Sequence, residues 1–230
     1  MITLGIETST MTGGAALLED NRLVAESILN VKTTHSERLL PGLDRMLRDS
    51  GMEISDVDVV AVSSGPGSFT GLRVGMSMAK GLVFASHRRL VCVPTLEAFA
   101  WQFPASCHPV CPLFDARKQE LYGAVFVWND ACGIFERVVP ERALAPGQWI
   151  EQLKTFDKVI LAGEGARLQM EYFAAALGKR AIFAPAHVMA PSAAAVAFVG
   201  TGLAGQGAFT DPVAAIPFYL RKSEAELKRK

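Results

Sequence analysis

Short runs of apolar residues open the chain and predict three strands before the first helix. These runs cover Ile2–Glu7, Gly14–Glu19 and Leu23–Leu29. The Asp20-Asn21 step between the second and third runs is typical of a tight hairpin, because both residues tolerate left-handed backbone conformations. A small polar tip at residues 8–13 separates the first two strands.

Two helices are predicted in the next part of the chain. Residues 36–50 place apolar side chains three or four positions apart, which makes one stripe on a helix. A β-branched run at 57–63 is typical of a strand buried on both faces, and it leads through a glycine loop into a helix over about 71–86. This alternation of strand, loop and helix implies an α/β architecture.

The pattern restarts near residue 105, so we predict one domain over residues 1–104 and a second over 105–230. In the second domain we expect strands at 110–114, 120–128, 133–140 and 157–163, and helices at 146–153, 166–177 and 192–203. No apolar run reaches the roughly 18 to 20 residues that a membrane span needs.

Charge and cysteine content exclude several classes of protein. The 23 Lys and Arg residues balance the 23 Asp and Glu residues, so the chain lacks the basic surplus that binds nucleic acid through phosphates. The notable basic cluster is the tail, Arg221-Lys222 and residues 228–230, which is either solvated or attracted to tRNA. Four cysteines are too few for a disulfide scaffold, and a cytoplasmic location is expected.

The segment Gly65–Arg73 is the strongest candidate for chemistry. A glycine loop between a buried strand and a helix turns backbone amides toward anions. Neither the P-loop pattern nor G-x-G-x-x-G fits, and both fail at Thr70. Arg73 opposes the helix dipole, so we expect an anion near it: a phosphate, a partner's carboxylate, or Glu7 of the chain itself.

Motifs for metal or nucleophilic catalysis are weak. A metal site could be formed by Cys107-His108-x-x-Cys111 together with Cys132 or His187. A purely structural role for these residues is the interpretation that we favour. The four histidines never recur at helical spacing, and G-x-S-x-G is absent. We therefore assign no catalytic residue and no metal ligand.

The helices over 36–50 and 71–86 combine small and apolar residues. They are expected either to lie in the chain's own core or, as we favour, to have one face in contact with another subunit. The residues predicted for this partner interface are Leu39, Leu43, Met46, Leu72, Gly75, Met76, Ala79 and Val83.

Several ordered segments together resemble the bacterial TsaB (YeaZ-like) family over nearly the whole chain. The Gly65–Arg73 block is the most specific of them. The full set is Ile6–Thr10, His35–Pro41, Gly65–Arg73, Ala79–Leu82, Thr95–Ala98, Asp115–Arg117, Glu120–Tyr122 and Pro217–Arg221.

The resemblance implies an actin-like ATPase (ASKHA, RNase H-like) fold of two lobes, the second reduced. It also implies a non-catalytic scaffold and activator of TsaD, with TsaE as accessory ATPase, in making threonylcarbamoyladenosine beside the anticodon of tRNAs that read codons starting with A. Contact with tRNA is then indirect, and the free chain is expected to form a homodimer through the surface that meets TsaD.

Nucleotide binding is the last implication of the resemblance. The family fold holds nucleotide with a phosphate hairpin, which here begins with Glu7 rather than Asp. The candidate phosphate or anion loop is Glu7, Thr8, Ser9, Gly65, Gly67, Ser68, Thr70 and Arg73. We expect weak or no ATPase activity, with ATP or ADP possible at the boundary with the partner. The alternatives are a small actin-fold ATPase or kinase and, third, a peptidase, which the motifs disfavour.

Overall fold

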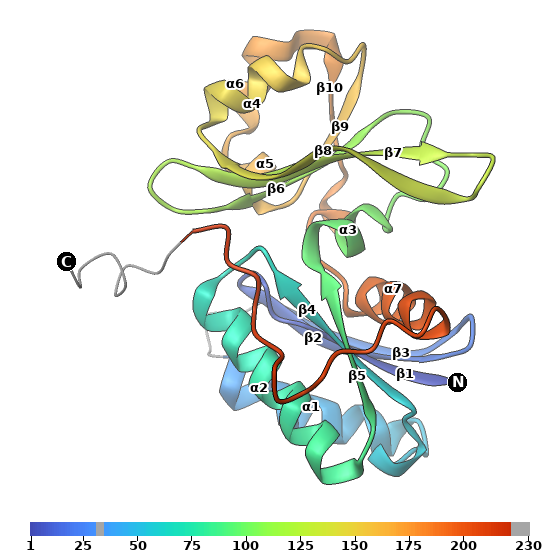
Figure 1. Ribbon diagram of the computed structural model, residues 1–230. Helices are drawn as coiled ribbons and strands as arrows, with labels where there is room; N and C mark the ends of the chain where they lie inside the picture. Colours follow the sequence, from blue (N-terminus) through green and yellow to red (C-terminus); the bar gives the residue numbers. More distant parts are fainter. Residues whose placement is uncertain (31–34, 222–230) are drawn as a thin grey trace. The chain divides into compact units, whose positions relative to one another are not determined.

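The computed structural model describes residues 1–30 and 35–221, which form two compact units (Figure 1). Unit 1 comprises Met1–Ala98 and Pro191–Phe218, and unit 2 comprises Phe99–Ala190 and residues 219–221. Residues 222–230, which include most of the predicted basic tail, lie outside the described residues.

Unit 1 is built on a five-stranded sheet with the order β3-β2-β1-β4-β5. Strands β1, β2 and β3 are antiparallel neighbours, whereas β4 and β5 run parallel to β1 on its other side. The strands are β1 (Ile2–Glu7), β2 (Thr12–Glu19), β3 (Arg22–Asn30), β4 (Val59–Gly65) and β5 (Arg89–Pro94).

Helices cover both faces of this sheet. The helices are α1 (His35–Asp49), α2 (Phe69–Ser86) and α7 (Ala193–Gly205), with α3 (Thr95–Ala100) after β5. Leu4 and Ile6 of β1 share a buried cluster with side chains of α1 and α2. Gly5, between them in sequence, instead lies against Ala193 and Ala197 of α7. Because side chains alternate along a strand, α7 covers the face opposite to α1 and α2.

The position of α7 corrects the predicted domain division. Residues 191–218 return to unit 1, so the second domain does not extend over 105–230 as expected. Helix α7 carries no charged residue and packs on β1, β2 and β4. A Cβ atom on Gly200 would lie 2.3 Å from Cβ of Ala61, so the absent side chain permits this contact. Because α7 is apolar, it is buried against the sheet of unit 1, although it follows the residues of unit 2 in the sequence.

Unit 2 repeats the connectivity of unit 1. Its sheet has the order β10-β9-β6-β7-β8, in which β6, β7 and β8 are antiparallel and β9 and β10 run parallel to β6. The elements are β6 (Val110–Asp115), β7 (Leu121–Asn129), β8 (Ile134–Leu144), α4 (Pro146–Leu153), β9 (Val159–Ala162), α5 (Glu164–Leu168), α6 (Met170–Leu177) and β10 (Ala181–Phe183).

Most predicted elements are confirmed, and the exceptions are local. The helix expected over 166–177 is two helices, because Gln169 takes φ −110° and ψ 19° between α5 and α6. Strand β10 was not predicted. Helix α2 begins at Phe69, where the Ser68 hydroxyl accepts a hydrogen bond from the Gly71 amide. None of the helices in the described ranges is long and apolar enough to cross a membrane.

Candidate functional site

The hairpin between β1 and β2 meets the start of α2, and this contact brings most of the predicted anion loop together. The Ser68 amide donates to the Ser9 carbonyl at 2.6 Å. The Thr8 hydroxyl donates to the Gly71 carbonyl at 2.8 Å. Segments about 60 residues apart in sequence therefore form one joint, which we call the hairpin–α2 joint (residues 7–10 with 67–75).

Glycines allow the joint to close. A Cβ atom on Gly71 would lie 2.0 Å from the Thr8 carbonyl oxygen, and one on Gly75 would lie 2.2 Å from the Thr8 hydroxyl oxygen. Both distances are far below van der Waals contact. Gly71 and Gly75 of α2 therefore make room for the hairpin of the same chain.

Two further segments of the chain form hydrogen bonds with the loop before α2. The Gly65 amide donates to the Thr95 hydroxyl at 2.9 Å. The Phe218 amide donates to the Ser64 carbonyl at 2.7 Å. The loop is thus fixed on both sides, by the hairpin and by the chain that follows α7.

Glu7 is the acidic residue of the joint, and its side chain is 1% exposed. One carboxyl oxygen, Oε1, accepts a hydrogen bond from the Ser9 amide, while Oε2 has no hydrogen-bond partner among the described residues. Burial raises the pKa of Glu7 to about 7, although hydrogen bonds from Ser9, Ser63 and the Thr8 amide oppose the shift. The neutral form of this carboxyl group is therefore well populated near pH 7.

The side chain of Arg73 extends to the surface, although the residue lies in the α2 part of the joint. Its side chain is exposed, and its guanidinium carbon lies 3.8 Å from the centre of the Phe69 ring. Oε1 of Glu7 is bonded to the Ser9 amide, and burial is the largest cause of its raised pKa. Thr70 is also exposed on the first turn of α2.

Four backbone amides of the joint are already used within the chain. The amides of Thr8, Ser9, Ser68 and Gly71 already donate to oxygens of the chain. Binding of ATP or ADP, in this loop or at a boundary with a partner, stays a prediction.

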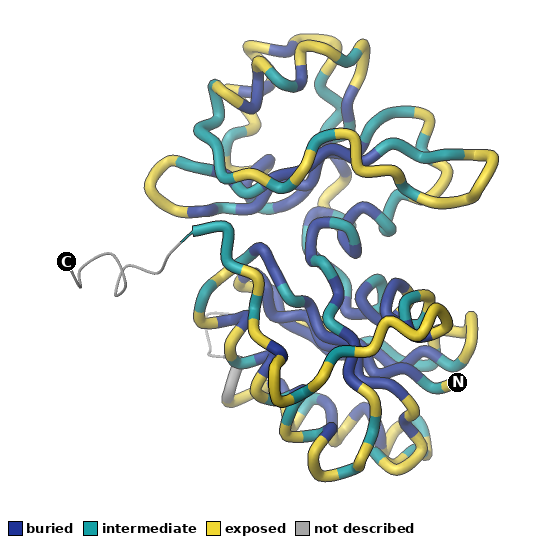
Figure 2. The backbone as a smooth tube through the Cα atoms, viewed as in Figure 1, coloured by how far each residue is buried: buried dark blue, intermediate teal, exposed yellow. Residues whose placement is uncertain are grey.

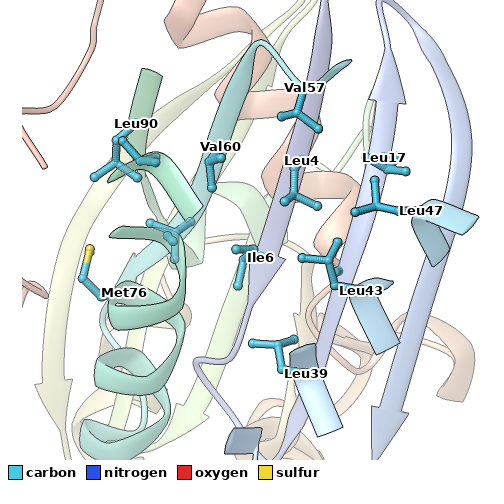
Figure 3. Packing of buried hydrophobic residues seen from close by; sticks show 14 of the residues in the cluster. Leu4, Ile6, Leu17, Leu39, Leu43, Leu47, Val57, Val60, Met76 and Leu90 are labelled. Carbon is cyan, nitrogen blue, oxygen red and sulfur yellow. The ribbon is translucent and has the colours of Figure 1, made fainter. Parts of the chain in front are cut away.

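The eight residues predicted for the partner interface lie in the core of unit 1. Their side chains are at most 7% exposed, and Gly75 is also buried. Figure 3 shows Leu39, Leu43 and Leu47 of α1 reaching toward Leu4, Ile6 and Leu17. The choice of these eight side chains as a contact surface is wrong, because the sheet of the same chain covers them. The residues are Leu39, Leu43, Met46, Leu72, Gly75, Met76, Ala79 and Val83.

Other apolar side chains on the same helices do face outward. Leu40 of α1 is 56% exposed and Phe84 of α2 is 54% exposed. Each directly follows a buried residue of the stripe, Leu39 or Val83, and points to another side of its helix. In the sequence, each of these two residues is an apolar residue that lies one position away from the apolar stripe of its helix.

The other candidate chemistry is not assembled. Cys111 is buried in the core of unit 2, whereas Cys107 is exposed. Within residues 1–30 and 35–221 no three His, Cys, Asp or Glu side chains are arranged to hold a metal ion. In the Gly163-Glu164-Gly165 segment, the two glycines pack against the Leu113 carbonyl. Burial there raises the pKa of Glu164.

Sequence comparison identifies the family. The family model described as TsaD, tRNA N6-adenosine threonylcarbamoyltransferase, matches residues 22–229. A Bacillus subtilis protein named tRNA threonylcarbamoyladenosine biosynthesis protein TsaB is 32% identical over 229 residues, covering 99% of this chain and 97% of the relative. The chain belongs to the TsaB family. A Haemophilus influenzae protein of the same name is 32% identical and covers 70% of this chain and 71% of its own length.

Solved structures agree with the TsaB assignment. A Pseudomonas aeruginosa protein described as similar to the peptidase YeaZ has a TM-score of 0.80 and 26% identity, over 96% of this chain and 99% of its own. Component A of the (R)-2-hydroxyglutaryl-CoA dehydratase of Acidaminococcus fermentans has a TM-score of 0.52 at 12% identity, over 89% and 99%. The latter likeness concerns the fold alone. The predicted α/β fold of the actin-like ATPase class is confirmed.

Proposed function

We propose that the chain is a non-catalytic activator in the synthesis of threonylcarbamoyladenosine on tRNA. In this role it binds a TsaD-type transferase, with TsaE as accessory ATPase, and contacts tRNA indirectly within the complex. The modified adenosine is the one beside the anticodon of tRNAs that read codons starting with A. The observation that carries the proposal is the similarity to TsaB over 99% of the chain.

The hairpin–α2 joint supports the non-catalytic part of the proposal. A transferase or kinase of this fold class needs open donors for an anionic substrate. Here the donors of Ser9 and Ser68 are bonded within the chain, and Glu7 beside them is buried. In this proposal, the nucleotide that takes part in the reaction binds at the boundary between this chain and its partner.

The outward sides of α1 and α2 are the proposed surface for the transferase. Leu40 and Phe84 supply exposed apolar area, and Arg73 supplies a positive charge. Exposed aromatic and arginine side chains are the types that contribute most to protein interfaces. Self-association of the free chain and a cytoplasmic location complete the proposal.

Reconstitution tests this function. Threonylcarbamoyl transfer to tRNA is measured with the TsaD-type enzyme, TsaE and the threonylcarbamoyl-adenylate donor, with and without this chain. We expect product only when the chain is present. Equal transfer in both reactions overturns the activator role. The alternative is then a small actin-fold ATPase or kinase, and it is tested by measuring ATP hydrolysis by the chain alone.

A further inference from the structure

The segment that follows α7 carries the two most exposed large apolar side chains in the described part of the chain. We call this segment, residues 206–218, the strap. Val213 is 75% exposed and Ile216 is 76% exposed, and Phe218 at the end of the strap is 51% exposed. Figure 2 shows most of the strap as exposed. Exposed apolar side chains that gather in one place mark a surface for another molecule.

Hydrogen bonds and burial hold the strap on unit 1. The Thr210 amide donates to the Leu90 carbonyl of β5 at 2.8 Å, and the Phe218 amide donates to the Ser64 carbonyl at 2.7 Å. Between these two points Ala215 is 5% exposed and belongs to the core cluster of unit 1. Because its backbone is already ordered, the strap loses little conformational freedom when it meets a partner.

A turn inside the strap fixes the backbone around Val213. One carboxylate oxygen of Asp211 accepts a hydrogen bond from the Val213 amide at 2.9 Å, and the Asp211 carbonyl accepts one from the Ala215 amide at 2.9 Å. Asp211 is the one acidic residue of the strap. Its carboxylate is thus used in the turn that presents Val213 to the outside.

The strap runs beside the outward side of α2 (Figure 1). The Lys80 ammonium nitrogen lies 3.5 Å from the Val213 carbonyl oxygen. Lys80 and Phe84 are four residues apart in α2, so they share one side of the helix. The apolar surface of the strap therefore adjoins Phe84, which belongs to the surface proposed for the transferase.

Positive charge accompanies this apolar surface. Residues 59–96 contain no Asp or Glu, although the whole chain has no net charge. Lys80 and Arg89 have no carboxylate partner among the described residues, and the Arg89 guanidinium carbon lies 4.5 Å from the centre of the Phe209 ring of the strap. An acidic surface is therefore complementary to this region, whereas a basic one is repelled. The cations of the stretch are Arg73, Lys80, Arg88 and Arg89.

We propose that the strap and the adjoining side of α2 bind an acidic, partly apolar surface of the transferase. In this contact Val213 and Ile216 meet apolar side chains, and Lys80 lies opposite carboxylates of the partner. The inference rests on the proposed function, because it takes the transferase as the partner and extends the surface of α1 and α2 to the strap.

The combination of aliphatic and cationic side chains favours a protein over tRNA as the occupant. Phosphates are bound by cations, and unpaired bases stack on aromatic rings. The aliphatic side chains of Val213 and Ile216 do neither, although they are the most exposed part of the surface. A protein surface with an apolar centre and charged surroundings meets both kinds of side chain.

Titration of the isolated transferase with strap variants tests the proposal. We expect Val213→Asp and Lys80→Glu each to weaken the affinity about ten-fold or more, because each places a negative charge opposite the partner's carboxylates. The melting temperature of Val213→Asp stays unchanged, since the side chain is 75% exposed. The matched controls in unit 2 are Leu168→Asp, at a 62% exposed position, and Lys158→Glu, also exposed, and both bind like the native chain.

Salt dependence distinguishes a charged contact from a purely apolar one. We expect the affinity of the native chain for the transferase to fall as the NaCl concentration rises, because salt screens exposed charges. In Lys80→Glu this fall is smaller. A salt dependence that is the same in Lys80→Glu as in the native chain overturns the assignment of Lys80 to a partner carboxylate.

The outcomes separate this inference from the proposed function. Val213→Asp and Lys80→Glu chains that bind the transferase as tightly as the native chain overturn the inference and leave the activator role standing. A native chain that does not bind the transferase overturns both. Variants that lose affinity for tRNA while they keep their affinity for the transferase also overturn the inference, and they assign the strap to nucleic acid.

Discussion

The Thr8 hydroxyl donates to the Gly71 carbonyl across a separation of 63 positions in the chain. This bond joins the β1–β2 hairpin to the first turns of α2, in the segment whose sequence most strongly predicted anion binding. Within the joint, backbone donors that an anion would use are bonded to the chain's own oxygens. A loop pattern typical of ligand binding thus serves here to fasten two parts of unit 1.

The joint makes Gly71 sensitive to the smallest side chain. We expect Gly71→Ala to lower the free energy of unfolding by roughly 1 to 3 kcal/mol, because the added Cβ would lie 2.0 Å from the Thr8 carbonyl oxygen. The matched control is Gly81→Ala on the same helix, where no atom lies within 4 Å and stability rises by about 0.5 to 1 kcal/mol. Urea denaturation of both variants checks this, and equal effects would contradict the joint.

The raised pKa of Glu7 makes stability depend on pH. Between its ordinary pKa of 4.5 and its folded pKa of about 7, the native chain keeps a proton that the unfolded chain has released. The free energy of unfolding therefore falls as pH rises through this window, by about 3 kcal/mol for this group. Below pH 4.5 and above pH 7 this contribution is constant.

Glu7→Gln isolates that contribution, since glutamine stays neutral and has nearly the same shape. We expect the variant to lose the decline attributed to Glu7 and to exceed the native chain in stability at pH 8. Denaturation of both proteins at pH 5 and pH 8 provides the measurement. If both lose the same stability between these pH values, the carboxyl group is not held neutral by burial.

The occupied donors of the joint predict no ATP binding by the isolated chain. We expect millimolar ATP with Mg²⁺ to leave its melting temperature unchanged. A nucleotide present at 100 times its dissociation constant would add about 2.7 kcal/mol to stability, which thermal denaturation detects easily. Stabilisation by ATP that disappears in Arg73→Glu would show that the segment around α2 does bind phosphate.

The exposed side chains of α1 and α2 predict the effect of surface variants on partner binding. Leu40→Asp and Phe84→Asp are expected to weaken association with the transferase about ten-fold or more and to reduce transfer in parallel, with the fold intact. Ile134→Asp in unit 2, at a 47% exposed position, is the control and should bind normally. Unchanged affinity in both variants would place the interface elsewhere.

Local patterns in the sequence account for most of the elements. Alternation predicts β1 to β3, the apolar stripe predicts α1, and Pro146 marks the start of α4. Such patterns depend on neighbours within a few positions, so they are present in the sequence itself. They did not reveal the break at Gln169 or the three-residue strand β10, because such short features have no period.

The candidate site was predictable in part. The sequence selected Glu7, Ser9 and Ser68 as members of one loop region, and the structure brings them together. It did not reveal that they bond to one another. Small residues are compatible with an open cradle for a ligand and with close packing, and only the position of Thr8 distinguishes the two.

By itself, the sequence determined the α/β class, the membership of the family and the side chains that are apolar. Tertiary structure alone decided where those side chains are covered: Met76 and Ala79 lie against the sheet of unit 1, and α7 crosses back to that unit. The physical reason is that burial and hydrogen bonding depend on contacts between segments far apart in sequence. Local periodicity shows that a face is apolar, whereas the fold determines whether the chain itself or another molecule covers it.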